Sequence, residues 1–315
     1  MSRPVVVGYD PRRPDWAPVY FGVEGARIAR TRLIVAAVEA SGLEPPMTAG
    51  QMVAFAAAQV DHDLVPDCRA MLAEVEAKLH ADAIPADCVR LRGSSVAKAM
   101  HELAERVEAA LLVVGARRAR GVLGSTAVAL MHGSPCPVAV VPNDWDEGRP
   151  LREIGAAYVD SGEARAALRG AHALARRAGA KLRVISVVTH SPRMYLETQT
   201  YVAGQFGQDL EDVEGGQKLW TERHLREVVA ELGDAVSIEI DVMVGDPAEL
   251  LVEVSRHLDL LVMGARGYGP LRAVLLGSVS RRVTASARCP VIVLPRGVKA
   301  PLEVLVADGQ LSASA

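Results

Sequence analysis

Short apolar runs alternate with longer amphipathic segments along the second half of the chain. The apolar runs cover residues 154–159, 182–188, 236–244, 258–263 and 290–294, and between them helical periodicity predicts helices over residues 163–177, 218–232, 247–257 and 278–287. In the 163–177 helix, Ala164, Ala167 and Leu168 share one face, and Gly179 ends the segment. Strands that alternate with crossover helices predict a parallel sheet, and continuously apolar strands are typical of a sheet covered on both faces.

The first half repeats this pattern. Its apolar strands lie near Val5, Leu33, Val89, Leu112 and Val138, and a long segment, residues 39–66, falls within its second crossover. Cys-Pro-Val-Ala-Val-Val-Pro at residues 136–142 matches Cys-Pro-Val-Ile-Val-Leu-Pro at 289–295. We therefore predict two tandem doubly wound α/β modules, each a five-stranded parallel sheet with helices on both faces, over residues 1–146 and 150–297, followed by a tail over 298–315.

Composition narrows the classes of function. The 315 residues suffice for two domains, and 50% of them are hydrophobic. A formal net charge of −3 gives no reason to expect nucleic acid or an anionic membrane as a partner. The chain shows neither a leader-like start nor an apolar run of membrane-spanning length, so we expect a cytoplasmic protein. The four scattered cysteines indicate inert thiols and no metal site.

A glycine-rich loop follows the fourth strand of the second module. Gly264-Ala265-Arg266-Gly267 is followed by nine residues and then by Gly277-Ser278-Val279-Ser280 at the start of a helix. Glycines let backbone N–H groups approach an anion, and a helix N-terminus supplies further N–H groups and a favourable dipole. Ser278 can cap the helix and donate to a phosphate, and Ser280 can add a second hydroxyl. A lone Gly-Ser pair would indicate only a capped helix.

The full spacing, Gly-x-x-Gly-x9-Gly-Ser, resembles the nucleotide signature of the universal stress protein family. The closing helix, the Cys-Pro-Val strand after it and Asp160 at the end of the first strand extend this resemblance over nearly all of residues 1–297. It implies strand order 3-2-1-4-5 in each module and an ATP site, with Mg²⁺ able to bridge the phosphates. The implied contacts are Asp160 to ribose or adenine, the Val187 backbone to adenine, Met263 near the base or sugar, and Gly264, Arg266, Gly267, Gly277, Ser278, Val279 and Ser280 around the phosphates. Asp160 has the alternative, compatible role of capping the following helix, and Met263 that of a core residue.

The first module departs from this signature. Arg118 replaces the second glycine, and only five residues separate it from Gly124-Ser125. The shorter loop moves the backbone away from the phosphate path, and the Arg118 side chain hinders close approach. We expect that the first module does not bind ATP in the ordinary way; the alternative is that Arg117, Arg118 and Arg120 bind another anion.

Three functions fit the sequence. The leading hypothesis is a nucleotide-binding stress-response protein that acts through its bound state, because no catalytic carboxylate or metal motif accompanies the loop. The second is slow ATP hydrolysis or phosphotransfer, with Asp160 or Asp246 placing metal or water. The third is a nucleotide-independent dimerising scaffold. Residues 138–141 and 291–294 are expected to pair within the chain, with a homodimer as a further arrangement. We also expect an edge strand at 302–306 and a disordered end at 309–315.

Overall fold

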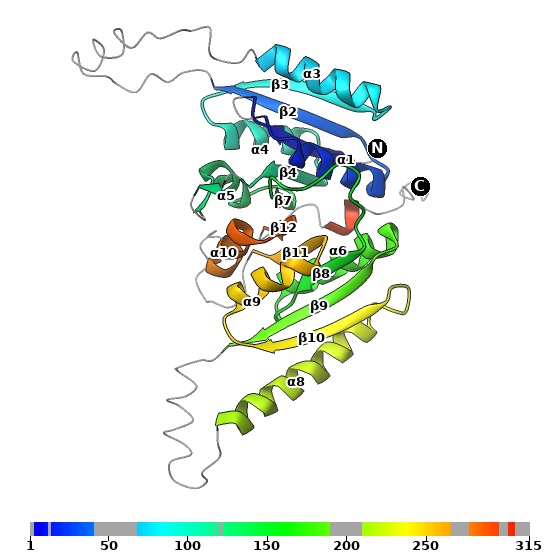
Figure 1. Cartoon of the computed structure of the whole chain (residues 1–315), viewed down its shortest axis with the longest axis vertical. Helices are drawn as coiled ribbons and strands as arrows, with labels where there is room; N and C mark the ends of the chain where they lie inside the picture. The colour runs from blue at the N-terminus through cyan, green and yellow to red at the C-terminus, as the bar shows by residue number, and fades with distance from the viewer. Residues whose placement is uncertain are drawn as a thin grey trace, which may run out of the picture.

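The computed structural model describes residues 3–11, 14–40, 68–116, 118–119, 122–189, 210–265, 277–295 and 302–305. One ten-stranded sheet runs through both modules in the order β10-β9-β8-β11-β12-β7-β4-β1-β2-β3 (Figure 1). Each half has the predicted order 3-2-1-4-5. The strands are β1 (Val5–Tyr9), β2 (Leu33–Ala40), β3 (Ala86–Gly93), β4 (Leu111–Gly115), β7 (Val138–Val141), β8 (Glu153–Ala157), β9 (Lys181–Val188), β10 (Ile238–Val244), β11 (Leu260–Gly264) and β12 (Val291–Leu294).

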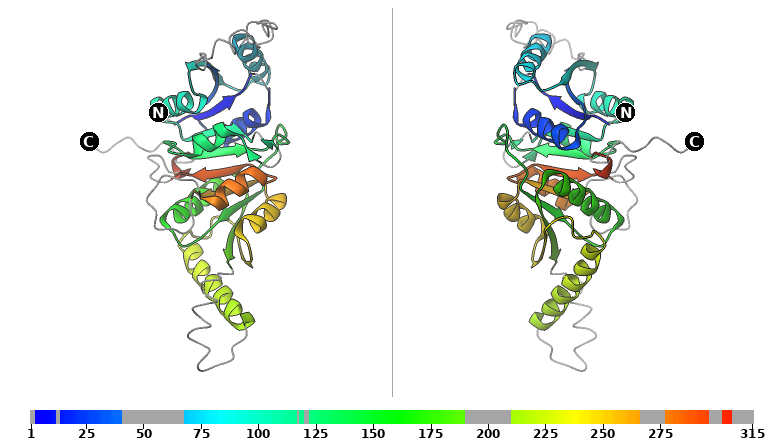
Figure 2. Two further views of the ribbon diagram at one scale, coloured as in Figure 1. Left: turned by 90° about the vertical axis from the view of Figure 1, so that its left-hand side faces the viewer. Right: turned by 90° about the vertical axis from the view of Figure 1, so that its right-hand side faces the viewer.

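Helices cover both faces of this sheet (Figure 2). The helices are α1 (Ala17–Ala29), α3 (Cys68–Ala81), α4 (Val96–Arg106), α5 (Ser125–Met131), α6 (Gly162–Ala178), α8 (Leu210–Ala230), α9 (Pro247–Val254), α10 (Ser278–Ser286) and the 3-10 turn η2 (Ser255–His257). The core on one face includes residues of α1, α3, α6 and α8, and the core on the other includes residues of α4, α5, α9 and α10. Each core extends across both modules. Among the described residues, no helix is long and apolar enough to cross a membrane.

The two modules join through their last strands. β12 pairs with β7 in antiparallel fashion, with Ile292 opposite Ala139 and Val293 opposite Val138. These side chains are at most 1% exposed. The predicted pairing within the chain is therefore confirmed, and it covers two apolar edges that would otherwise favour aggregation.

The outer strands differ from the continuously apolar pattern that we predicted. No position of β3 is buried, and Val242 is the one buried position of β10, which also carries Glu239 and Asp241. Arg183 of β9 forms an ion pair with Asp241. Each outer strand has one neighbour within the described sheet, so its side chains lie partly outside the core, and charges on such an edge hinder pairing with other chains.

The predicted edge strand at residues 302–306 is wrong. Leu302–Leu305 form a 3-10 turn, η3, that packs on α6. Leu302 is fully buried, and a Cβ added to Gly170 would lie 2.6 Å from the Leu302 Cβ. A short apolar run is compatible with either a strand or a turn that packs on a helix. Here the turn packs on α6 because Gly170 has no side chain and leaves space for Leu302. The predicted disordered end, residues 309–315, lies outside the described residues.

The predicted inert character of the cysteines agrees with their surroundings. Burial raises the pKa of both Cys136 and Cys289 to about 12, and that of Cys88 to about 11. These thiols remain protonated near neutral pH and are poor nucleophiles.

Candidate functional site

The candidate site lies at the carboxyl ends of β8, β9 and β11. Strand order reverses between β8 and β11, and ligands of open α/β sheets bind beyond the strand ends at such a switch point. Val187 is the last but one residue of β9 and is half-buried. Met263 of β11 is 5% exposed and belongs to the core, which matches its alternative interpretation.

Hydrogen bonds hold the two ends of the glycine-rich loop together. The Gly277 N–H donates to the Ala265 carbonyl at 2.9 Å, and the Ala265 N–H donates to the Leu294 carbonyl at 2.9 Å. The Ser280 hydroxyl lies 3.1 Å from the Gly264 carbonyl oxygen and 3.0 Å from that of Ala265, and donates to them. The start of α10 is thus fixed to the end of β11. Arg266 and Gly267, predicted on the other side of the phosphates, lie outside the described residues.

The first turn of α10 is capped differently from our prediction. The N-cap is Gly277, without a side-chain hydrogen bond, and Ser278 is the first helical residue with an exposed side chain. Ser280 is 2% exposed and its hydroxyl is used within the protein, so any bond from Ser280 to a ligand would come from its N–H. First-turn N–H groups have no partner four residues earlier in the helix and can bind an anion.

Gly264 has a packing role. A Cβ at this position would lie 3.2 Å from the Glu163 Cβ and 3.4 Å from the Glu163 carbonyl carbon. The missing side chain therefore allows the start of α6 to approach the end of β11. This contact joins the start of α6, which follows Asp160 and Ser161 in the chain, to the end of β11.

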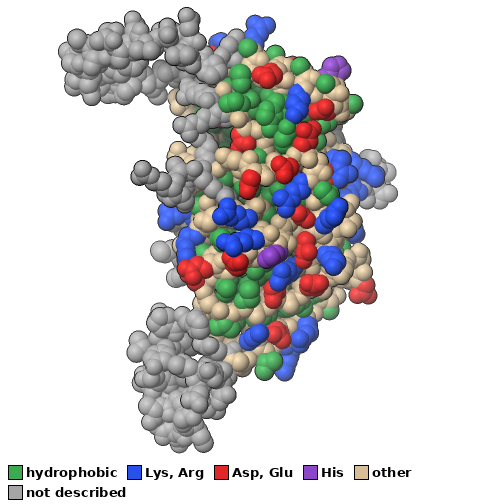
Figure 3. Space-filling model, viewed as in Figure 1, with side chains coloured by type: hydrophobic (Ala, Val, Ile, Leu, Met, Phe, Trp, Pro, Cys, Tyr) green, Lys and Arg blue, Asp and Glu red, His purple; other side chains and the backbone are tan. Residues whose placement is uncertain are grey.

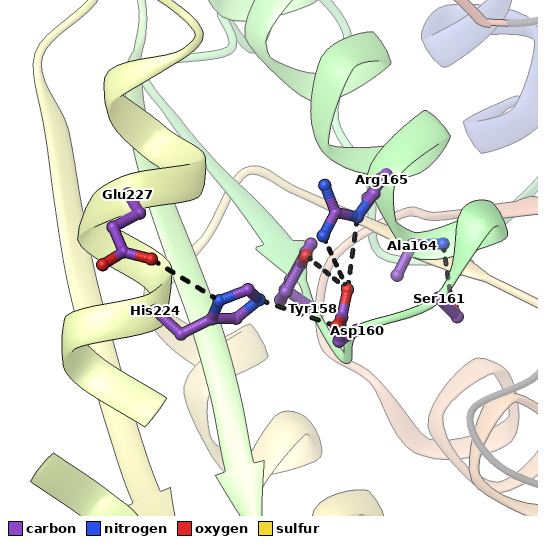
Figure 4. A network of polar contacts seen from close by, with 7 residues as sticks. All are labelled: Tyr158, Asp160, Ser161, Ala164, Arg165, His224 and Glu227. Carbon is purple, nitrogen blue, oxygen red and sulfur yellow. Dashed lines mark hydrogen bonds and ion pairs between the residues drawn. The ribbon is translucent and has the colours of Figure 1, made fainter. Parts of the chain in front are cut away.

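Asp160 is held in a polar network between α6 and α8 (Figure 4). Its Oδ1 accepts hydrogen bonds from Arg165 Nε at 3.2 Å, Arg165 Nη2 at 2.9 Å and the Tyr158 hydroxyl at 3.3 Å. Its Oδ2 lies 3.7 Å from His224 Nε2. The Arg165 hydrogen bonds hold the pKa of the Asp160 carboxyl below its usual value, so the group is ionised at neutral pH.

The alternative role of Asp160 as a helix cap is wrong. Ser161 is the N-cap of α6, and its hydroxyl oxygen accepts from the Ala164 N–H at 3.2 Å. With the capping role taken by Ser161, the Asp160 carboxylate is left to the network at the edge of the sheet.

Asp246 has the predicted capping role at α9. Its Oδ1 accepts from the N–H groups of Ala248 and Glu249, each at 2.9 Å, and Arg282 Nη1 of α10 lies 2.9 Å from its Oδ2. The Glu249 N–H and the Arg282 guanidinium hold the pKa of Asp246 below its usual value. The Asp246 carboxylate thus caps α9 through Oδ1 and links it to α10 through Oδ2.

Comparison with known proteins identifies the family. The sequence model of the universal stress protein family matches residues 1–142 and again residues 150–295. The chain belongs to the universal stress protein family. The universal stress protein Rv2319c of Mycobacterium tuberculosis is 26% identical over 308 residues, which cover 92% of this chain and 99% of that protein.

Solved structures agree on the fold. A universal stress protein from Archaeoglobus fulgidus superposes with a TM-score of 0.63 at 19% identity, covering 93% of this chain and 96% of the other. A putative universal stress protein from Pseudomonas aeruginosa gives a TM-score of 0.61 at 17% identity, covering 97% and 95%. The fold is therefore shared along nearly the whole length of these chains.

The first universal stress protein module carries a hairpin where the second has its glycine-rich loop. β5 (Arg118–Ala119) pairs with β6 (Val122–Leu123) in antiparallel fashion. Leu123 is 5% exposed and β6 packs against α10 of the second module. The shortened loop thus has a structural role at the module boundary.

A carboxyl group lies beside Gly115, the residue of the first module that corresponds to Gly264. Asp15 Oδ1 accepts from the Ala17 N–H at 3.0 Å, and a Cβ on Gly115 would lie 3.2 Å from Asp15 Oδ2. Burial raises the pKa of the Asp15 carboxyl above its usual value. At the corresponding position in the second module, a Cβ on Gly264 would meet the Cβ and backbone of Glu163 and the Ala164 nitrogen rather than a carboxylate oxygen.

Sequence reasoning missed several residues of the site. Tyr158, Ser161 and Arg165 flank Asp160 in the chain, and their polarity beside a strand end was a usable signal. His224 is distant in sequence, and no motif links it to Asp160. Asp15 lies within a stretch that the second module lacks, so repeat alignment could not place it.

Proposed function

We propose that this universal stress protein binds ATP, mainly in its second module, and acts through the nucleotide-bound state. The observation that carries the proposal is the fixed junction of β11 and α10. There the first-turn N–H groups of α10 lie at the carboxyl edge of the sheet, and the ionised Asp160 follows β8 at the same edge.

Each part of the nucleotide has a matching group in this proposal. The adenine contacts the backbone at Val187, and Met263 lies beneath the base or sugar. Asp160 accepts a hydrogen bond from the ribose. The phosphates bind the N–H groups of Ser278, Val279 and Ser280 on one side, where Gly277 carries no side chain to hinder their approach, and Gly264, Arg266 and Gly267 on the other. Mg²⁺ can bridge the phosphate oxygens, since it retains several waters and needs few protein ligands.

The first module is proposed not to bind ATP. Its hairpin uses backbone groups for strand pairing, and the Asp15 carboxyl beside Gly115 would repel a phosphate. Binding of another anion by Arg117, Arg118 and Arg120 stays a prediction; the side chains of these three residues are outside the described part of the chain.

Two alternatives remain as outcomes of experiment. Slow hydrolysis or phosphotransfer would need a carboxylate for metal or water, and Asp246 has both oxygens engaged in capping and ion pairing. A nucleotide-independent scaffold would need a surface other than the β7–β12 pairing to bind a second chain, because that pairing already forms within one chain. A cytoplasmic location and a homodimer stay expectations.

Calorimetric titration of the whole chain with ATP and Mg²⁺ tests the proposal. We expect one site per chain. In the Gly277→Asp variant, a carboxylate at the helix N-terminus should repel the phosphates and lower the affinity at least tenfold, while as an N-cap it should preserve or raise the melting temperature.

The outcomes separate the three functions. If the titration detects no binding of ATP, the scaffold function is supported. If it detects two equivalent ATP sites per chain, our account of the first module is contradicted. Release of radiolabelled phosphate by the wild type above the Gly277→Asp level would show that the protein is a hydrolase.

A further inference from the structure

A histidine of α8 reaches the carboxylate to which the proposed function assigns the ribose. His224 points from α8 toward Asp160, which follows β8 (Figure 4). The distance from His224 Nε2 to Asp160 Oδ2 is 3.7 Å, too long for a hydrogen bond. The helix that follows β9 therefore contributes a nitrogen to the edge of the candidate site.

The two oxygens of Asp160 are used unequally. Arg165 and Tyr158 donate only to Oδ1. Within the described residues, Oδ2 accepts no hydrogen bond, and the Asp160 side chain is 49% exposed. Oδ2 is thus a charged acceptor, without a hydrogen bond of its own, on a half-exposed side chain.

His224 Nε2 is a buried polar atom that has no hydrogen-bond partner among the described residues. Such atoms are rare, because leaving one unsatisfied costs free energy, and they often indicate a missing water or ligand. One hydroxyl oxygen can satisfy both atoms, accepting from an Nε2–H while donating to Oδ2, since two hydrogen bonds of about 2.8 Å easily span this gap. A small rotation of the exposed Asp160 carboxyl would admit the hydroxyl.

The surroundings of His224 fix its ring. Trp220, one turn earlier on α8, stacks on it with the ring centroids 5.4 Å apart and the planes 10° from parallel. The second ring nitrogen of His224, Nδ1, lies 4.0 Å from Glu227 Oε2. Trp220 is itself 63% exposed, and its ring stacks on His224 at the protein surface.

We propose that His224 and Asp160 together bind a ribose hydroxyl and so select nucleotides that carry this hydroxyl over the deoxy analogue that lacks it, with Trp220 as a positioning residue for the His224 ring. This assignment rests on the proposed nucleotide site and adds to it a residue that the glycine-rich loop does not supply.

Calorimetric titration of the whole chain with ATP, 2′-deoxy-ATP and 3′-deoxy-ATP tests it. We expect the wild type to prefer ATP to at least one of the deoxy analogues by about tenfold, which is the effect of one hydrogen bond to a charged group. His224→Phe keeps the ring and the stack but removes the N–H, so the preference should fall below the wild-type value, while the contribution of the Asp160 acceptor remains. His224→Gln restores an N–H donor and should recover part of it.

Controls separate recognition from folding. Arg226→Gln changes an exposed residue of α8 that pairs with Glu222, and should keep the wild-type preference. Trp220→Phe retains an aromatic stack and should behave like the wild type, whereas Trp220→Ala should weaken the preference. Circular dichroism checks the fold of each variant.

Two results would overturn the proposal in distinguishable ways. If His224→Phe binds ATP with the wild-type preference, the hydroxyl contact is wrong and the nucleotide site stands. If the wild type binds no nucleotide, the proposed function and this inference both fail.

Discussion

At the scale of single residues, glycines and serines of one motif have different physical roles. Gly264 admits α6 to the end of β11, whereas Gly277 caps α10 and closes the loop through its N–H. Ser278 is exposed, whereas the Ser280 hydroxyl is buried and bonded to carbonyls. A sequence motif therefore marks where a site lies without telling which of its residues contact a ligand and which hold the backbone.

A substitution at Gly264 tests its packing role. In Gly264→Val, the Cβ would meet Glu163 at 3.2 Å and the added methyl groups would press against α6. We expect a loss of about 1–3 kcal/mol in the free energy of unfolding, measured by urea denaturation without nucleotide. Gly162→Ala on α6 is the matched control, because a Cβ there would meet nothing within 4 Å and the stability should be unchanged or slightly raised. Equal stability of wild type and Gly264→Val would show that the glycine is retained for ligand binding alone.

The polar network shows why the site was only partly predictable. Asp160 was found because it ends an apolar strand at a repeated position. His224 approaches it only because α8 crosses back over the sheet, and neither its spacing nor its neighbours in sequence signal that contact. Such contacts depend on tertiary packing, which a periodic pattern does not encode.

At the scale of elements, the two modules use the same strands with different connections. The order of strands was predictable, because apolar runs and helical periodicity repeat in both halves. The ends of the helices were less predictable than the strand order. α8 begins at Leu210, well before the predicted residue 218, because polar residues and glycines such as Gly215 and Gly216 weaken the helical pattern of its first turns. The β5–β6 hairpin also escaped prediction, because a short polar loop has no fixed signature.

The connection between β1 and α1 gives a pH-dependent prediction. Asp15 has a raised pKa because of burial, so its charged form is less stable in the folded than in the unfolded chain. The resulting cost is absent below the unfolded pKa and complete above the folded pKa. Asp15→Asn keeps an acceptor for the Ala17 N–H but removes the charge, so we expect its stability relative to the wild type to increase from pH 3 toward pH 7. Urea denaturation across this range measures the difference. A relative stability that falls with rising pH would show that the ionised carboxylate stabilises the fold.

At the scale of the whole molecule, the chain is a pseudo-dimer built on one continuous sheet. The segment between the modules is packed against both of them: the Trp145 ring contacts Phe21 with centroids 5.7 Å apart, and Arg149 lies over Trp145 and bonds Asp259. Acidic and basic side chains are interspersed on the face shown in Figure 3, in keeping with the small net charge. The two modules are therefore held together by hydrophobic cores that extend across both of them and by the antiparallel pairing of β7 with β12, rather than by a charged surface.

This arrangement predicts that the halves recognise each other without a covalent link. Residues 1–146 and 147–315 expressed as separate chains should form a one-to-one complex, because β7 and β12 each expose an apolar edge when alone and pair through buried valine and isoleucine side chains. Sedimentation velocity of the mixed fragments measures the complex. Val293→Lys in the second fragment places a charge at a fully buried position of the joint and should prevent association. Arg288→Lys, at an exposed position on the same fragment, should leave it intact. If the wild-type fragments remain separate monomers, the linker rather than the strand pairing holds the modules together.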